Sequence, residues 1–296
     1  GGNRLAFITG RTSSTVFSVA DKNGSTPTAA SAGTAVGVYR AYNSLNAWES
    51  QTENPNITEP VENDVNPSTD LVGANTVMMV PAYGDGEDNA SVYIDSWTTD
   101  PSNYIKIYTP TSATEVGTSQ RHNGTWDTSA YRISMDGSYF APIGIFERYV
   151  RIEGLQIDSN LEVTGQSNGI QVDDGNGDTA VEIHISDSII RMSVASPATE
   201  AYGIGILNNF VGANNIFVAK VWNNLIYGYT AAGGTAGSCM YAQNSGTVYA
   251  YNNTCVGGSG AARGIAVFNF LDFYAKNNLS INSADPYFAS VSFNAA

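Results

Sequence analysis

The sequence predicts an all-β fold in which one elongated body is built from a stack of similar turns. A double-asparagine corner occurs three times, each copy following a short alternating apolar run, at 221–226, 250–255 and 275–280. Two degenerate copies precede them, at 152–157 and 185–190. Consecutive copies are spaced by 25 to 36 residues when the markers are Gly154, Ser188, Asn224, Asn253 and Asn278. Periods in this range are typical of solenoids, in which each turn buries its apolar face only against its neighbours.

A second apolar segment accompanies each corner, so we expect two strands per turn and about six coils. It reads Gly-Ile-x-apolar at 169–172, 203–206 and 264–267. Asparagine suits a corner because it tolerates the left-handed backbone of a sharp bend. Identical amides one rung apart, roughly 4.8 Å, can also pass hydrogen bonds along the stack. We therefore predict a structural ladder of Asn223, Asn224, Asn252, Asn253, Asn277 and Asn278.

The N-terminal part of the chain differs from the repeats. Residues 1–41 contain short apolar runs, which predict a β-strand extension whose strands are available to pair with a neighbouring molecule. Residues 43–50 predict a short helix capped by Asn43 or Ser44, with Leu45 and Trp48 on one face. A helix of this kind suits the lid of an apolar column. The expected units are the extension, 1–41, and the solenoid with its capping helix, 42–296.

Taken together, the asparagine corners, the helix at 43–50 and the apolar strand at 76–83 resemble a right-handed parallel β-helix of the pectin-lyase-like superfamily. Residues 131–288 carry the resemblance well and residues 42–130 moderately. Within that superfamily the chain is most similar to secreted bacterial β-helix proteins that have no assigned activity. The resemblance implies the fold. It does not imply one chemistry, because of the polygalacturonase-like motifs only Asp173-Asp174 is present.

Composition narrows the class of function. The formal net charge of −14 argues against nucleic-acid binding, which needs a basic face. No run of about 18 apolar residues occurs, so we expect no membrane span. Only 14% of residues are charged, and such a polar, lysine-poor surface favours a secreted or cell-surface protein. Cys239 and Cys255 are compatible both with a disulfide and with two small core residues.

Aligning the strands on their corners predicts one outward row and a second row beside it. The first row contains three weak catalytic candidates, Arg151, His184 and Lys220, because polysaccharide lyases of this fold generally use a basic residue. Tyrosine and tryptophan can stack on sugar rings, and cations can pair with uronate carboxylates. The predicted carbohydrate contacts are Trp222, Tyr249, Tyr251, Tyr274 and Lys276. The alternative is that outward strand positions simply tolerate polar and aromatic residues.

One loop imitates the start of a calcium-binding loop. Its ligand candidates are Asp174, Asn176, Asp178 and Glu182. Thr179 stands where the pattern requires glycine, and Ile185 stands where it requires glutamate. Those departures favour an ordinary turn between strands over a Ca²⁺ site.

The sequence therefore favours an extracellular structural or adhesive β-helix that is not catalytic and requires no cofactor. Its expected partners are other copies of itself, stacked head to tail into filaments, or a cell-surface polysaccharide. The alternative is a Ca²⁺-assisted polysaccharide lyase, or a carbohydrate-binding β-helix that acts on acidic polysaccharide.

Overall fold

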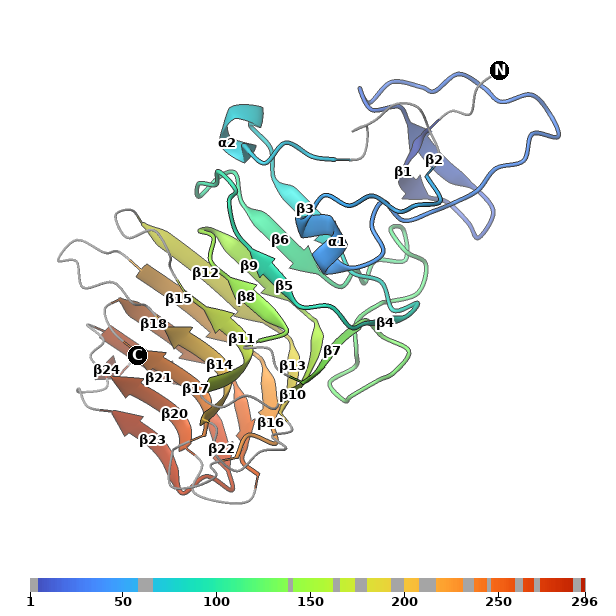
Figure 1. Cartoon of the computed structure of the whole chain (residues 1–296). Helices are drawn as coiled ribbons and strands as arrows, with labels where there is room; N and C mark the ends of the chain where they lie inside the picture. The colour runs from blue at the N-terminus through green and yellow to red at the C-terminus, as the bar shows by residue number, and fades with distance from the viewer. Residues whose placement is uncertain are drawn as a thin grey trace.

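A computed structural model describes most of the chain, and its architecture is a parallel β-solenoid (Figure 1). The described residues are 5–57, 66–137, 141–161, 166–173, 180–192, 200–207, 217–230, 237–243, 246–258, 263–268, 272–289 and 294–295. Within them, three parallel sheets run along the stack, two with seven strands and one with eight. The stack descends in Figure 1 from β3 and β6 to β23 and β24.

Each sheet takes one strand from each coil. Sheet 1 contains β3 (Met78–Pro81), β6 (Ile105–Tyr108), β9 (Val150–Glu153), β12 (Val181–Ser186), β15 (Phe217–Trp222), β18 (Thr247–Tyr251), β21 (Asp272–Lys276) and β24 (Asn294–Ala295). Sheet 2 contains β4 (Glu87–Asp88), β7 (Arg132–Gly137), β10 (Gln156–Leu161), β13 (Ile189–Met192), β16 (Leu225–Tyr227), β19 (Thr254–Val256) and β22 (Leu279–Ile281). Sheet 3 contains β5 (Val92–Ile94), β8 (Ile143–Ile145), β11 (Gln166–Val172), β14 (Glu200–Leu207), β17 (Ser238–Gln243), β20 (Arg263–Phe268) and β23 (Asp285–Ala289).

The chain visits the three sheets in strict rotation, so each coil has three strands and the expectation of two was wrong. The missed strands are those of sheet 2. In the later coils they are as short as Leu225–Tyr227 and directly follow the corner. The prediction of an all-β solenoid is confirmed, because parallel strands stack along all three faces.

Alternation along the strands places the core inside the coil. In β12, Val181, Ile183 and Ile185 are buried, whereas Glu182 and His184 point outward and are half-buried. The same pattern recurs in β15 and β18. Because strands are stacked in register, like residues form apolar columns that continue from coil to coil.

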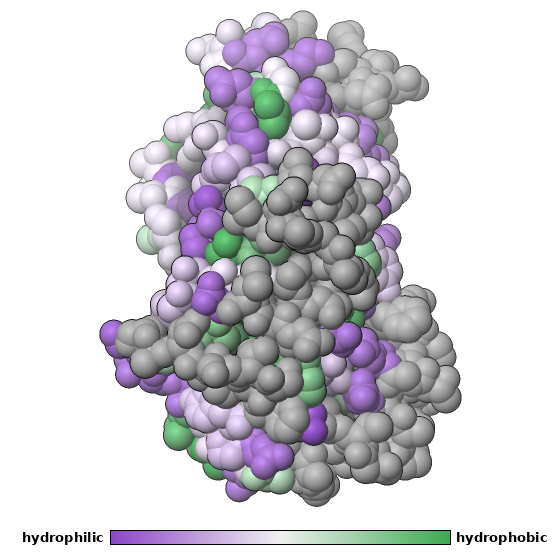
Figure 2. All heavy atoms as spheres, turned by 90° about the vertical axis from the view of Figure 1, so that its left-hand side faces the viewer, coloured by the Kyte–Doolittle hydropathy of each residue, from purple (hydrophilic) through white to green (hydrophobic). Residues whose placement is uncertain are grey.

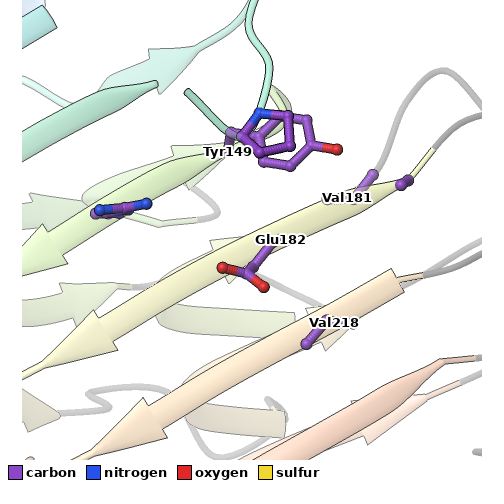
Figure 3. A pocket seen from close by; sticks show the side chains of 7 residues that line it. Tyr149, Val181, Glu182 and Val218 are labelled. Carbon is purple, nitrogen blue, oxygen red and sulfur yellow. The ribbon is translucent and has the colours of Figure 1, made fainter. Parts of the chain in front are cut away.

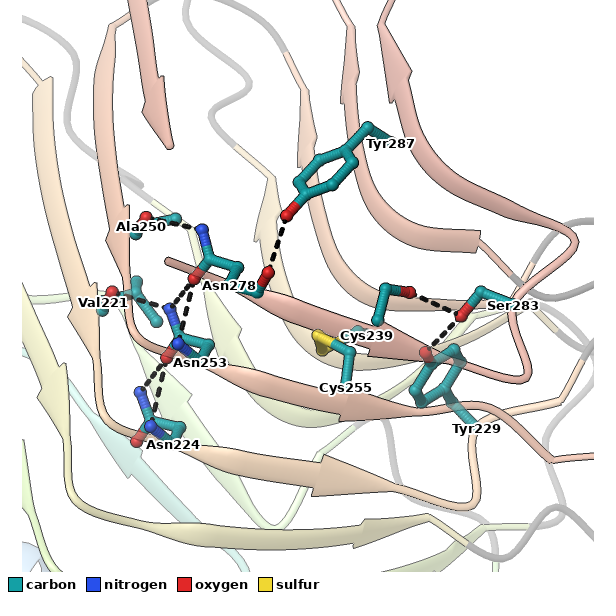
Figure 4. The surroundings of a disulfide bond; sticks show 11 residues. Val221, Asn224, Tyr229, Cys239, Ala250, Asn253, Cys255, Asn278, Ser283 and Tyr287 are labelled. Carbon is teal, nitrogen blue, oxygen red and sulfur yellow. Dashed lines mark hydrogen bonds between the residues drawn. A yellow bond between two sulfur atoms is a disulfide. The ribbon is translucent and has the colours of Figure 1, made fainter. Parts of the chain in front are cut away.

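The double-asparagine corner lies between sheets 1 and 2, and its two residues have different roles. The first residue of each pair, Asn223, Asn252 or Asn277, adopts a left-handed backbone with φ of 54° to 57°. The second residue points inward and forms the ladder (Figure 4). Asn224 Nδ2 donates to Asn253 Oδ1 at 3.0 Å, and Asn253 Nδ2 donates to Asn278 Oδ1 at 3.0 Å.

The register also corrects one of the residues used as markers for the spacing of the corners. Glu153 pairs with Ser186, so Gly154 is level with Asp187 and not with Ser188. Gly154 and Asp187 both have positive φ, 76° and 54°, which identifies them as the first residue of their corners.

A disulfide joins Cys239 of β17 to Cys255 of β19 across the interior, with their Cα atoms 5.6 Å apart (Figure 4). Both cysteines are fully buried. The bond therefore links sheet 3 of one coil to sheet 2 of the next. Of the two alternatives that the sequence left open, the structure contains the disulfide.

Before the coils, strands β1 (Phe7–Arg11) and β2 (Phe17–Ala20) pair antiparallel in a hairpin that lies to one side of the stack in Figure 1. Helix α1 (Leu45–Glu49) begins after Ser44, whose hydroxyl accepts the Ala47 N–H at 2.9 Å. Its buried Leu45 and Trp48 join the core beside β5, the edge strand of sheet 3. Helix α2 (Leu71–Ala74) precedes β3.

Much of the visible surface is polar. On the side seen in Figure 2, hydrophilic residues are spread over the described surface, and hydrophobic residues show only in small patches. Among the described residues, no helix has the length and apolarity that crossing a membrane requires.

Candidate functional site

The register of sheet 1 brings the predicted outward residues together on one face. Arg151, His184, Lys220, Tyr249 and Tyr274 are level with one another on β9, β12, β15, β18 and β21. Two residues further along the same strands lies a second row that contains Glu153, Ser186, Trp222, Tyr251 and Lys276. We call the outer surface formed by these two rows the strip. Because neighbouring strands are about 4.8 Å apart, the strip extends roughly 19 Å along the solenoid axis.

Aromatic rings occupy the C-terminal part of the strip. Tyr249 stacks on Tyr274 with ring centroids 5.0 Å apart and planes inclined by 11°. Tyr251 lies against Tyr249 at 6.1 Å, and the edge of one ring meets the face of the other between His184 and Trp222 at 5.5 Å. The rings in this part of the strip are half-exposed. They form a platform of the kind on which the apolar faces of flat ligands pack.

One carboxylate, Glu182, ties two of the catalytic candidates together. Lys220 Nζ donates to Glu182 Oε2 at 2.7 Å, and His184 Nε2 lies 2.7 Å from Glu182 Oε1. Burial alone would raise the pKa of Glu182, but these two hydrogen bonds outweigh burial, and its pKa lies below the ordinary value. Burial lowers the pKa of His184 despite the hydrogen bond to Glu182, which favours the neutral imidazole.

A second carboxylate, Glu153, holds two further cations at the other end of the strip. Its oxygens lie 2.6 Å from Lys106 Nζ and 2.6 Å from Arg121 Nη2. Burial again opposes ionisation, but the hydrogen bonds from both cations hold the pKa of Glu153 below its ordinary value. Arg121 was missed from the sequence because it lies in a polar stretch, 110–127, that carries no repeat.

Arg151 is bound differently from these cations. Its guanidinium carbon lies 3.4 Å from the centroid of the Tyr104 ring, and no carboxylate of a described residue pairs with it. Stacking on an aromatic face leaves the N–H donors at the guanidinium edge available.

Beside Arg151 is a pocket of about 200 Å³, and Figure 3 shows Glu182 on β12 next to it. The pocket is lined by Pro101, Tyr149, Arg151, Ala180, Val181, Glu182 and Val218.

Of the four predicted calcium ligands, Asp174, Asn176 and Asp178 lie outside the described residues. The fourth, Glu182, has both carboxylate oxygens bonded to side chains of the strip. In the part of the chain that the structure describes, no group of three or more histidine, cysteine or acidic side chains is placed to hold a metal ion.

Sequence reasoning also missed a group of perturbed carboxylates beside α1. Glu49 accepts hydrogen bonds from Trp97 Nε1 at 3.0 Å and from the Asp95 N–H at 2.9 Å. Glu147 accepts the Trp97 N–H at 2.8 Å. Burial raises the pKa of both glutamates, that of Glu49 to about 7. A pocket of about 260 Å³ adjoins Glu147, and these bonds fasten α1 to the first coils.

The strip can therefore contact a flat, extended ligand with rings and offer it cations, while most of its charge is neutralised internally. Comparison of the chain with protein-family models, with curated proteins and with solved structures finds no match in any of the three.

Proposed function

We propose that this chain is an adhesive β-solenoid of the cell surface or extracellular space, which binds an extended polysaccharide along the strip without cleaving it. The observation that carries the proposal is the continuity of the strip. Arg151, Trp222, Tyr249, Tyr274 and Lys276 follow one another over five neighbouring strands, so a polymer lying along the solenoid axis meets rings and cations in turn.

The location is supported by the buried disulfide between Cys239 and Cys255, because such bonds persist in oxidising compartments and are rare in the cytosol. The finer assignment of the fold, a right-handed helix of the pectin-lyase-like kind with α1 as its cap, is supported by the asparagine ladder and by the position of α1 beside an edge strand. End-to-end association of copies stays a prediction from the sequence.

The ion pairs of the strip favour binding over catalysis. A lysine that removes a proton from a sugar must be free to reach it, and Lys220 is held by an ion pair with Glu182 at 2.7 Å. One arrangement favours the alternative, a polysaccharide lyase: His184, whose pKa burial lowers, lies in the same row as Arg151. A neutral imidazole beside a cation is able to act as a general base.

Affinity electrophoresis in gels that contain pectin, alginate, xylan or dextran tests the proposal. We expect at least one polymer to retard the protein. The double variant Trp222→Ala/Tyr249→Ala should weaken that binding about tenfold, since each ring contributes roughly 0.5–1.5 kcal/mol. Tyr227→Ala is the matched control, because Tyr227 projects from sheet 2 on a different face. Equal retardation of wild type and double variant would refute the strip as the binding surface.

Incubation with the same polymers also separates binding from cleavage. We expect no ultraviolet-absorbing unsaturated product and no shortening of the polymer. Product that disappears in the variant His184→Gln would favour the lyase alternative instead.

A further inference from the structure

Only some of the cations of the strip have a carboxylate partner. Lys106 and Arg121 share Glu153, and Lys220 is bound by Glu182, so three of the cations on this face already have a carboxylate partner. Arg151 and Lys276 have no such partner among the residues that the structure describes. Each of these two side chains offers its full charge to a ligand.

The two unpaired cations are far apart. Arg151 is on β9 and Lys276 on β21, four strands further along sheet 1 and one row across. At about 4.8 Å per strand and two residues of offset, the two charges are roughly 20 Å apart. The interval contains the rings of His184, Trp222 and Tyr249. It also contains Lys220, whose charge is compensated by Glu182.

The two carboxylates lie between and beside these cations on the same surface. Both are already paired, Glu153 with Lys106 and Arg121 and Glu182 with Lys220, so neither carboxylate presents an uncompensated negative charge and the three cations are occupied. A polymer with an acidic group on every unit would therefore place many of those groups where no free cation meets them. Contacts that one ligand can make and another cannot discriminate between ligands that otherwise have the same shape.

We propose that the strip selects a mostly neutral polysaccharide with widely spaced acidic groups over a densely charged one. Arg151 and Lys276 each bind one acidic group, the rings between them pack on neutral sugars, and Glu153 and Glu182 keep Lys106, Arg121 and Lys220 from binding further acidic groups. Glu153 and Glu182 are thus specificity-determining residues that act on the ligand's charge density. This inference rests on the proposed function, since it describes the ligand of the same strip.

Two polymer series of graded charge test the selection: pectins that differ in methyl esterification, and carboxymethyl dextrans that differ in substitution. We expect affinity at low salt to be highest at a low fraction of free carboxylates and to fall toward the fully ionised polymer. Two ligand contacts also predict a shallow salt dependence, with a logarithmic slope of about two. A steady rise of affinity with charge density would overturn the inference and leave the proposed function standing. Absence of binding to every member of both series, the uncharged ones included, would overturn both.

Substitutions of the two glutamates test whether these residues determine the selection. We expect Glu182→Gln and Glu153→Gln each to raise affinity for the fully ionised polymers by about three- to tenfold and to move the optimum toward higher charge. Glu87→Gln is the matched control, because Glu87 pairs with Arg132 at 2.7 Å on sheet 2, away from the strip. That control should keep the wild-type optimum.

The two cations are tested in the opposite direction. Arg151→Gln and Lys276→Gln should each weaken binding of the sparsely charged polymers about threefold and reduce the salt slope by about one. Folded Glu182→Gln and Glu153→Gln proteins that both retain the wild-type optimum would contradict the role assigned to the glutamates.

Discussion

The corner between sheets 1 and 2 is built in two ways in the same molecule. In the later coils it is a tight pair of asparagines, and the inner amides of Asn224, Asn253 and Asn278 bond to one another. In an early coil the chain leaves the corner at Thr109 and makes an excursion before β7. There the Thr109 hydroxyl donates to the Gly154 carbonyl at 2.8 Å, and Arg121 reaches back to Glu153.

The difference shows what each device requires. A ladder of neutral amides fixes the register between coils without any ionisable group, but it needs corners of similar shape in neighbouring coils. An excursion interrupts that repetition, so its ends must be fastened individually. Gln156 does this with one buried amide, which accepts the Asp127 N–H at 2.6 Å and donates to the Tyr131 carbonyl at 3.1 Å. Other fastenings of the early coils use charges, among them the pairs of Glu153 with Lys106 and Arg121.

The largest expected effect breaks the ladder at its middle rung. Asn253 is fully buried, accepts from the Asn224 backbone and side chain, and donates to the Val221 carbonyl at 2.9 Å. Asn253→Ala removes all of these bonds at once. Because each buried polar group left unpaired costs about 1–3 kcal/mol, we expect the free energy of unfolding to fall by about 4 kcal/mol. Urea unfolding followed by circular dichroism measures it.

The neighbouring residue is the control for that experiment. Asn252 has φ of 54° and lies at the outer side of the corner, where glycine adopts the same backbone without strain. Asn252→Gly should therefore change the free energy of unfolding by only a few tenths of a kcal/mol. If both variants lost similar stability, the inner amide would have no special role.

The same contrast explains what the sequence could predict. The later corners could be located because Asn223-Asn224 and its copies satisfy two local requirements, a left-handed residue and a stackable amide, in adjacent positions. Gly154 was misaligned by one residue, since its inner neighbour is Leu155 and offers no amide to mark the ladder position. The strands of sheet 2 were missed because a segment such as Leu225–Tyr227 is too short to show alternation.

In the candidate site, too, the sequence could predict some features and not others. The two outward rows could be predicted, because their register follows from the corners and the period of two along a strand. The pairing of Glu153 with Arg121, 32 residues away, could not, because it depends on the path of a stretch without repeats. Nor could the carboxylates around Trp97, since Glu49, Asp95 and Glu147 come from three separate segments.

The second prediction concerns the disulfide, which reinforces the region of the ladder and not the early coils. It closes a loop of 16 residues between Cys239 and Cys255. In the chain-entropy model a loop of this size contributes about 3 kcal/mol. We expect Cys239→Ser/Cys255→Ser to lower the free energy of unfolding by about that amount, measured by urea unfolding. Wild-type protein with its disulfide reduced should match the double variant, and no loss in either would contradict the prediction.

The smallest expected effect concerns Glu49, the carboxylate that fastens α1 to the first coils. Burial, together with the charges of Asp95 and Glu147, raises the pKa of Glu49 to about 7 despite the hydrogen bonds from Asp95 and Trp97. The folded state therefore binds this proton more tightly than the unfolded chain, whose glutamate has the ordinary pKa of 4.5. The resulting stability is fully present below about pH 4.5 and is lost as the pH rises to about 7.

Urea unfolding at pH 5 and pH 8 measures this effect through the difference between wild type and Glu49→Gln. The comparison is needed because burial lowers the pKa of both histidines, which changes stability with the opposite sign in part of this range. From pH 5 to pH 8 we expect the free energy of unfolding to fall by about 1 kcal/mol more in wild type than in Glu49→Gln. The difference is no larger because solvent screens this half-buried carboxylate. The amide ladder does not titrate, so Asn253→Ala should keep the wild-type pH dependence. Identical pH dependence in wild type and Glu49→Gln would mean that α1 is not held through an ionisable contact.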